Sequence, residues 1–264
     1  SLVDGMQKDG LTDAYDNNAM GVCADLCATE YNFSREDQDK FAFESHMKAL
    51  KAQADGKFDS QIVPINIEQT FVNENGKKET KSYVVAKDEG PRFGTTVEAL
   101  ANLKPVFAAD GSVTAGNSSQ MSDGAAFVLV MSEEMVKELN LEPIARLVNF
   151  ASAGVEPRIL GIGPIKAIPK ALKQAGLTLN DIDLIELNES FASQALAVTR
   201  ELNLNPDSIN VNGGAIALGH PIGASGNRII VTLIHELIAE DKKLGLASLC
   251  IGGGMGTAIV LRRA

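Results

Sequence analysis

The sequence predicts a layered α/β fold joined to an irregular α+β region. Over residues 142–264, strand-like apolar runs alternate with helix-like amphipathic runs, a pattern typical of a sheet with helices on its faces. Two glycine-crowded segments, 212–226 and 250–256, follow predicted strands, where α/β sheets place their sites. Residues 1–121 lack this alternation. We therefore expect an irregular lobe followed by a regular α/β domain.

The first 121 residues predict an elaborated lobe rather than an independent core. Ser34 and Asp37 have the spacing of a capping box that opens a helix, which ends near Gly56. A β-like run at 62–67 contains a proline, which makes it an edge strand, and Asn75-Gly76 provides a hairpin turn. Cys23 and Cys27 are four residues apart and are expected to share one buried helical face.

Residues 122–141 predict one buried strand, 125–131, and one short helix capped by Ser132. A single strand and a single helix cannot bury their apolar faces alone. We therefore expect this segment to expose an apolar surface unless another part of the protein covers it.

Residues 142–264 contain the regular alternation. Gly176 closes the first predicted helix of this region. The predicted elements are a strand at 144–151, a helix at 165–175, a strand at 182–186, a helix at 191–202, a strand at 209–212, a helix at 225–239, and two strands at 246–251 and 257–261.

Composition limits the possible classes of function. The 264 residues are 45% hydrophobic and carry a formal net charge of -10, which argues against nucleic acid and anionic membranes as partners. The longest apolar runs, such as 125–131, are too short to span a membrane. The three cysteines form neither a metal spacing nor an even-numbered disulfide framework. We expect a soluble, cytoplasmic protein.

The glycine-rich segments hold one imidazole, His220, and one thiol, Cys250. Fixed glycines imply that the backbone closely approaches another group, and a His and a Cys framed by backbone amides suggest acyl transfer. The alternative is that each is an ordinary core residue beside a connecting turn.

Three segments then resemble the C-terminal signatures of the thiolases, the acetyl-CoA acetyltransferase and 3-ketoacyl-CoA thiolase family. They are Asn188-Glu189-Ser190-Phe191, Gly219-His220-Pro221 and Cys250-Ile251-Gly252-Gly253-Gly254, and their order and spacing match. Upstream, residues 34–39, 114–119 and 161–164 resemble further family segments. The resemblance implies a thiolase-like layered α/β fold, with a βαβαββ C-terminal domain at 142–264 and an α+β loop domain at 1–121 that grips coenzyme A.

The resemblance also implies that the nucleophilic cysteine lies in an N-terminal domain not seen in this sequence, which reads as the C-terminal two-thirds of a thiolase. Residues 122–141 would complete the sheet of that domain. The N-terminal third is expected on a second chain, or removed by cleavage or by design. The sequence does not choose among these.

By resemblance, His220 deprotonates the nucleophilic cysteine and Cys250 is the acid/base thiol for the α-carbon proton. Asn188 holds a water that polarises the thioester carbonyl, and the Gly252 N–H helps to bind the oxyanion. A helix-initiating Asn188 and a Cys250 that only packs at a strand end are the competing interpretations. Glu189 is expected to support the turn.

Coenzyme A is expected as a substrate, with no metal and no other cofactor. The matching positions are Ser119, Ala115 and Gly116 for pantetheine, Arg92 for the nucleotide, and Met20 and Phe191 for the acyl pocket. Because coenzyme A is a polyanion, a local basic patch is required, and the candidates are Lys77, Lys78, Lys81, Lys87 and Arg92. Ala19 stands where many biosynthetic acetoacetyl-CoA thiolases have His, which leaves longer 3-ketoacyl substrates open.

The family further implies a homo-oligomer in fatty acid or acetoacetyl-CoA metabolism, with acyl-chain length and direction of flux undetermined. Two alternatives remain. One is a non-catalytic thiolase-like subunit that binds acyl-CoA or serves assembly. The other is a ketoacyl synthase of the same superfamily, disfavoured because Cys250 stands where a second histidine is typical. His46 and His235 match no signature and are expected to be surface or packing residues.

Overall fold

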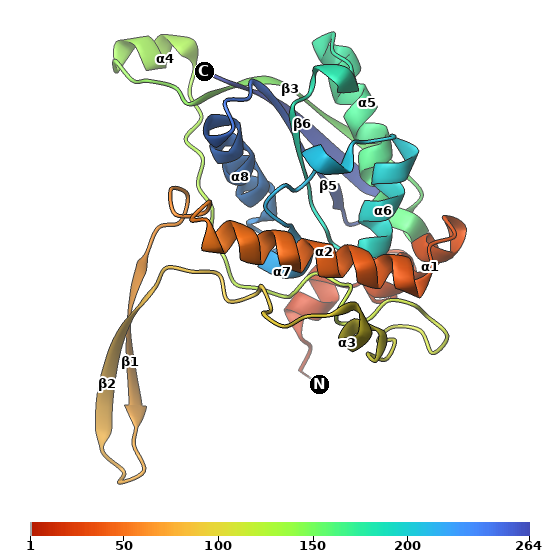
Figure 1. The fold of residues 1–264 in the computed structure, drawn as a ribbon, viewed down its shortest axis with the longest axis vertical. Coiled ribbons are helices and arrows are strands. Elements are labelled where there is room, and N and C mark those ends of the chain that lie inside the picture. Colours follow the sequence, from red (N-terminus) through yellow and green to blue (C-terminus); the bar gives the residue numbers. More distant parts are fainter. Residues whose placement is uncertain (1) are drawn as a thin grey trace.

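A computed structural model describes residues 2–264. A four-stranded sheet in the order β3-β6-β5-β4 forms the centre of the C-terminal region (Figure 1). Its strands are β3 (Ala145–Gly154), β4 (Leu184–Leu187), β5 (Leu244–Ile251) and β6 (Met255–Arg263). β4 and β5 are parallel, whereas β5 with β6 and β6 with β3 are antiparallel.

Helices cover both faces of this sheet. On one face, α5 (Gly163–Ala175) and α6 (Ala192–Glu201) bury a core that includes Ile168, Leu187 and Leu246. On the other, α8 (Ser225–Ala239) packs Leu233 and Leu237 against the sheet. Side chains of a strand alternate between its two faces, so adjacent strand residues supply different layers. The predicted layered α/β fold is confirmed.

The N-terminal helices pack onto this domain instead of forming a core of their own. They are α1 (Met20–Glu30) and α2 (Arg35–Ala54). Cys27 of α1 packs against Ile162 and Ala197, and Ala42 of α2 packs against Ala192 and Ile216. The Ser34–Asp37 capping box is present, and Cys23 and Cys27 are both buried. The predicted helix that begins after Ser34 is therefore confirmed as α2.

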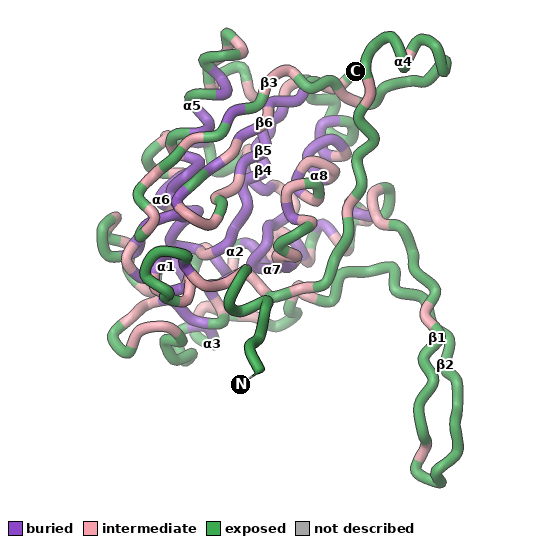
Figure 2. Tube along the Cα trace, turned by 180° about the vertical axis from the view of Figure 1, so that it is seen from behind, coloured by how far each residue is buried: buried purple, intermediate pink, exposed green. Residues whose placement is uncertain are grey.

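An exposed hairpin projects from the body, formed by β1 (Ile65–Val72) and β2 (Lys78–Val85) (Figures 1 and 2). Gly76 has φ 73°, as the predicted Asn75-Gly76 turn requires. The strand begins three residues later than the predicted run at 62–67 and lies beyond Pro64. The short remaining elements are α3 (Val97–Ala101), α4 (Glu133–Glu138) and α7 (Ala215–Leu218), the 3₁₀ turns Pro157–Ile162, Leu179–Asp181 and Pro206–Ser208, and a π turn at Met6–Gly10.

Two predicted strands are wrong. Residues 125–131 form no strand, because no other strand lies beside them to supply hydrogen bonds. Phe127, Leu129 and Val130 are 90%, 82% and 78% exposed. Residues 209–212 contribute one isolated parallel bridge, between Ile209 and Ile185, because a turn begins at Asn210, which has φ 43° and whose carbonyl accepts from the Gly213 N–H at 2.9 Å.

The helix after Ser132 is confirmed as α4, although no residue of it is buried. Figure 2 shows the exposed segment that leads to it. Within residues 2–264, no helix is long and apolar enough to cross a membrane.

Candidate active site

The ends of β4 and β5 bring two candidate residues together. Because these strands are parallel, their carboxyl ends lie at the same edge of the sheet. Asn188 directly follows β4, and its backbone N–H donates to the Ser248 carbonyl of β5 at 2.9 Å. Cys250 lies two residues further along β5. The local fold therefore places the amide and the thiol beside each other.

His220 reaches this edge on the loop between α7 and α8. Gly219 has φ 99°, and a Cβ there would lie 2.1 Å from Ser122 Oγ, so only glycine fits. The His220 N–H donates to the Gln120 carbonyl at 2.9 Å. Gln120 Nε2 in turn donates to carbonyls that include those of Gly90 and Ile216. The segment around 120–122 thus fixes the loop that carries the imidazole.

The hydrogen bonds of Ser225 determine the His220 tautomer. Ser225 Oγ donates to the Pro221 carbonyl at 2.9 Å, so it accepts from His220 Nδ1, 2.5 Å away. Nδ1 therefore carries the hydrogen, and Nε2 keeps a free lone pair toward Asn188 Nδ2 at 3.4 Å. Burial, followed by the charge of Arg228, lowers the pKa of His220 to about 4. The imidazole is neutral at pH 7 and is able to accept a proton at Nε2.

One hydroxyl contacts all three candidate side chains. Ser190 Oγ lies 3.0 Å from Asn188 Nδ2, 3.5 Å from His220 Nε2 and 3.4 Å from Cys250 Sγ. Burial raises the pKa of Cys250, while the bond from Ser190 opposes this rise. Burial outweighs the hydrogen bonds, so the pKa of Cys250 is raised overall.

The glycine turn after Cys250 lies against α1. A Cβ on Gly252 would come 3.1 Å from Met20 Cε, so the predicted pocket methionine borders the predicted oxyanion donor. The adjacent Gly253 and Gly254 have φ near +84°, which turns the chain from β5 into β6. The backbone of Gly252 is thereby partly exposed close to Cys250, with no side chain to cover it.

The carboxylate of Glu189 supports the turn beneath the site. It accepts from Ser45 Oγ at 2.7 Å, from Asn210 Nδ2 at 2.9 Å and from the Ile216 N–H at 3.2 Å. Burial raises the pKa of Glu189 despite these bonds. Asn188 Oδ1 is buried and has no partner among the described residues. That oxygen is the acceptor left available at the site.

The residues predicted to contact coenzyme A divide into two groups. Ser119 donates its backbone N–H to the Ser190 carbonyl at 3.0 Å, so the loop with Ala115 and Gly116 adjoins the site. Phe191 packs edge-on against Phe107, with ring centroids 6.1 Å apart. Arg92, by contrast, is exposed, and its backbone N–H donates to Nδ1 of the buried His46 at 3.2 Å.

The basic candidates are not gathered into one patch. Lys77, Lys78 and Lys81 belong to the projecting hairpin, and Lys87 follows it. Figure 1 shows that this hairpin projects away from the four-stranded sheet. His46 is a buried packing residue, and His235 is partly buried with Nδ1 2.9 Å from Ser60 Oγ, as expected for residues outside the site.

Sequence reasoning gave no role to Ser190, Ser225 or Arg228. Ser190 lies two residues after Asn188, and Ser225 begins α8 five residues after His220. Their closeness in sequence to a candidate residue was the signal that could have identified both. Arg228 lies in a buried charged cluster with Glu186, 3.6 Å away. Burial and then repulsion from Glu236 raise the pKa of Glu186, and the charge of Arg228 opposes this rise.

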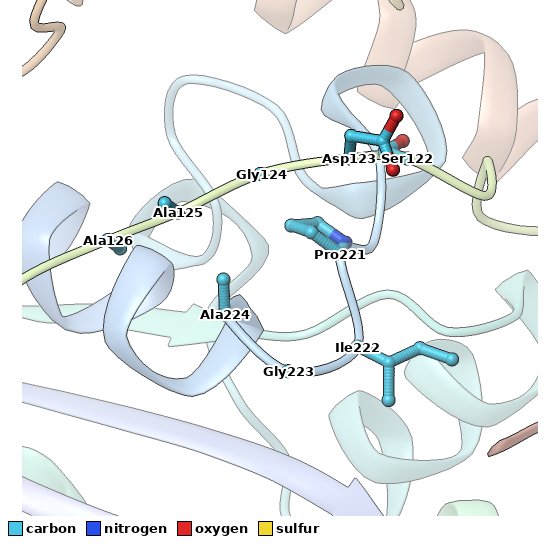
Figure 3. A pocket seen from close by; sticks show the side chains of 9 residues that line it. All are labelled: Ser122, Asp123, Gly124, Ala125, Ala126, Pro221, Ile222, Gly223 and Ala224. Atoms are coloured by element: carbon cyan, nitrogen blue, oxygen red, sulfur yellow. The ribbon is translucent and has the colours of Figure 1, made fainter. Parts of the chain in front are cut away.

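A hollow of about 370 Å³ adjoins the His220 loop (Figure 3). It lies between the segment 122–126 and the segment 221–224, and its lining is mostly backbone and small side chains. Among residues 2–264, no group of three or more His, Cys, Asp or Glu is placed to hold a metal ion.

The fold and this edge define a layered α/β protein with a Cys, His and Asn site built on glycine turns. The chain matches the family models for the thiolase C-terminal domain over residues 141–263 and the thiolase N-terminal domain over residues 1–134. The chain belongs to the thiolase family.

Relatives and solved structures match this chain over 97–100% of its length. It is 53% identical over 263 residues to a probable acetyl-CoA acyltransferase of Staphylococcus aureus (strain COL), covering 100% of this chain and 65% of the relative. The solved Bacillus anthracis acetyl-CoA acetyltransferase is 46% identical with a TM-score of 0.93, covering 100% of this chain and 65% of that one. Human mitochondrial 3-ketoacyl-CoA thiolase is 41% identical with a TM-score of 0.86, covering 97% and 63%. The chain thus spans 65% of the length of its bacterial relatives.

Proposed function

We propose that this chain supplies the acid/base groups and part of the acyl-CoA pocket of a thiolase, an acyltransferase that cleaves or forms 3-ketoacyl-CoA. The supporting observation is the contact of Asn188, His220 and Cys250 with one hydroxyl, at the edge where β4 and β5 end. Acetyl-CoA acyltransferase names among relatives that match the whole chain add support.

In this proposal His220 is the general base. Its Nε2 lone pair takes the proton of a nucleophilic cysteine that a segment outside residues 1–264 supplies. The thiolate attacks the 3-keto carbonyl, the bond between the α-carbon and that carbonyl breaks, and the electron pair moves to the α-carbon. A neutral imidazole suits this role because a protonated one could not accept.

Cys250 is then the acid that protonates the α-carbon: its S–H bond breaks and a C–H bond forms. Its thiolate next takes the proton of the incoming coenzyme A thiol, whose sulfur attacks the acyl-enzyme. The nucleophilic cysteine leaves as a thiolate and takes its proton back from His220. Each proton and electron pair is accounted for, and no oxidant is needed. The raised pKa of Cys250 keeps its thiol protonated until the carbanion forms.

Two groups of donors would stabilise developing oxyanions. Asn188 and His220 bind the thioester oxygen with a water, for which the unpartnered Asn188 Oδ1 is an available acceptor. The Gly252 N–H faces the tetrahedral intermediate. Coenzyme A would lie along the loop 115–119, whose link to Ser190 supports that placement. Cytoplasmic location, homo-oligomerisation and the boundaries 1–121, 122–141 and 142–264 stay predictions.

The test is to purify the protein from the cells that make it and to measure thiolysis of acetoacetyl-CoA beside intact masses. A smaller cysteine-bearing chain that co-migrates with full activity would support the proposal. In that preparation His220→Ala and Cys250→Ala should each lower kcat by about 10²–10⁴-fold, while His235→Ala should not. Thiolysis by these 264 residues alone would contradict the mechanism.

A further inference from the structure

Ser190 is held rigidly at the point where the candidate residues meet. It is 8% exposed. Its backbone N–H donates to Gln194 Oε1 at 3.1 Å, and its carbonyl accepts from the Ser119 N–H at 3.0 Å. Because both backbone groups are occupied, the side chain has little freedom beyond rotation of its hydroxyl.

The partners of the Ser190 hydroxyl fix its donor and acceptor roles. Asn188 Nδ2 only donates, so it gives a hydrogen bond to Ser190 Oγ. His220 carries its hydrogen on Nδ1, so its Nε2 only accepts. The hydroxyl hydrogen therefore has two possible acceptors, His220 Nε2 at 3.5 Å and Cys250 Sγ at 3.4 Å.

We propose that Ser190 is a positioning residue whose hydroxyl donates to His220 Nε2 in the resting site, where the imidazole is neutral and Cys250 is a thiol, and turns to donate to Sγ when Cys250 becomes a thiolate. This assignment rests on the proposed acid/base role of Cys250. It names a residue for which the sequence gave no role, and it links the two candidate acid/base groups without direct contact between them.

The chemical step balances without a covalent change at Ser190. When Cys250 gives its proton to the α-carbon, S–H breaks, C–H forms and the sulfur retains the electron pair of the broken bond. The Ser190 hydroxyl keeps its own proton and rotates toward the negative sulfur. When Sγ has taken the coenzyme A proton and His220 has returned its proton to the nucleophilic cysteine, the hydroxyl turns back to Nε2, which restores the starting arrangement.

The surroundings make this hydrogen bond important. Burial raises the pKa of Cys250, and the bond from Ser190 is the largest opposing cause. The titratable groups that face the thiol are His220, which is neutral above about pH 4, and Cys27 of α1, whose pKa burial raises to about 12. Neither changes charge between pH 6 and 10, so the rise of the alkylation rate with pH in that range reports the thiolate fraction of Cys250.

The experiment follows alkylation of Cys250 by iodoacetamide between pH 6 and 10, read by mass spectrometry on the peptide that follows Lys243. Alkylation rate reports the thiolate fraction. A hydrogen bond to a charged group contributes about 1.5–3 kcal/mol, so Ser190→Ala should slow alkylation at pH 8 about tenfold and move the midpoint to higher pH. Ser190→Thr, which keeps the hydroxyl, should titrate near the wild-type midpoint.

Ser193→Ala is the matched control, because Ser193 is also buried but its hydroxyl donates to the Ala24 carbonyl at 3.0 Å instead of to the thiol. An unchanged midpoint in Ser190→Ala, or an equal change in Ser193→Ala, overturns the proposal. Should Ser190→Ala fail to fold, Ser190→Gly removes the same hydroxyl. The readout needs no turnover, so the positioning role is overturned or supported independently of thiolase activity.

Discussion

At the residue scale, candidate residues of the site are held in place by neighbours that have no proposed role in proton transfer. Ser225 fixes the ring of His220, and Glu189 fixes the backbone turn behind Asn188. Removal of a partner should therefore change the state of the candidate residue before it changes the fold.

Ser225→Ala tests this directly. The His220 Nδ1–H loses its acceptor, so both neutral tautomers should appear in the ¹⁵N spectrum at pH 7, where the wild type shows Nδ1–H alone. The free energy of unfolding should fall by about 1 kcal/mol. Ser193→Ala provides the comparison, with the wild-type tautomer retained. A single unchanged tautomer in Ser225→Ala would refute the assignment.

The titration of His220 is a further prediction at this scale. Its ring signals should stay those of neutral imidazole from pH 7 down to about pH 4, and a midpoint near pH 6.5 would contradict this. The unfolded chain takes up that proton near pH 6.5, before the folded chain does. This residue therefore lowers the stability of the protein as pH falls from 6.5 to 4, and its contribution is constant above 6.5.

At the scale of elements, we expect the contribution of an N-cap to the free energy of unfolding to depend on how much of its helix is buried. The Ser34 capping box begins a twenty-residue helix with seven buried residues, whereas Ser132 caps α4, which buries none. Ser34→Ala should lower the free energy of unfolding in urea by about 1 kcal/mol. Ser132→Ala should lower it by much less. Equal losses would show that burial does not determine the effect.

Elements with a local signal were predictable from the sequence. The Ser34 cap, Gly176 at φ 68° and the Asn75-Gly76 turn each specify backbone geometry through one or two residues. Strands 125–131 and 209–212 failed because apolar runs indicate burial, whereas a strand also needs a neighbour. For the site, His220, Cys250 and Asn188 were found from their segments, but Ser190 was not, because its importance comes from contacts across sixty residues of sequence.

At the scale of the whole molecule, the apolar surface around 127–150 is the largest departure from an ordinary soluble domain. Phe127, Leu129 and Val130 on one extended segment, and Phe150 on β3, are at least 63% exposed, and exposed apolar surface of this kind mediates association. The purified chain should bind a hydrophobic dye and self-associate with increasing concentration in sedimentation experiments.

Leu129→Lys with Phe127→Ser should reduce both dye binding and self-association, while the unfolding midpoint stays within about 0.5 kcal/mol of the wild type because neither side chain is packed. The hairpin change Tyr83→Ser, at a residue that is 40% exposed, is the control. Dye binding that persists in the double variant would place the sticky surface elsewhere.

The segment 120–122 holds the loop that carries His220. The Gln120 carbonyl accepts from the His220 N–H, and Gly219 lies against Ser122. The same segment leads into the exposed apolar residues 127–130. The loop that carries His220 also packs on it further along, where Gly124 lies beside Pro221 (Figure 3). A partner that packs on residues 120–126 should therefore also restrict the motion of the loop that carries His220.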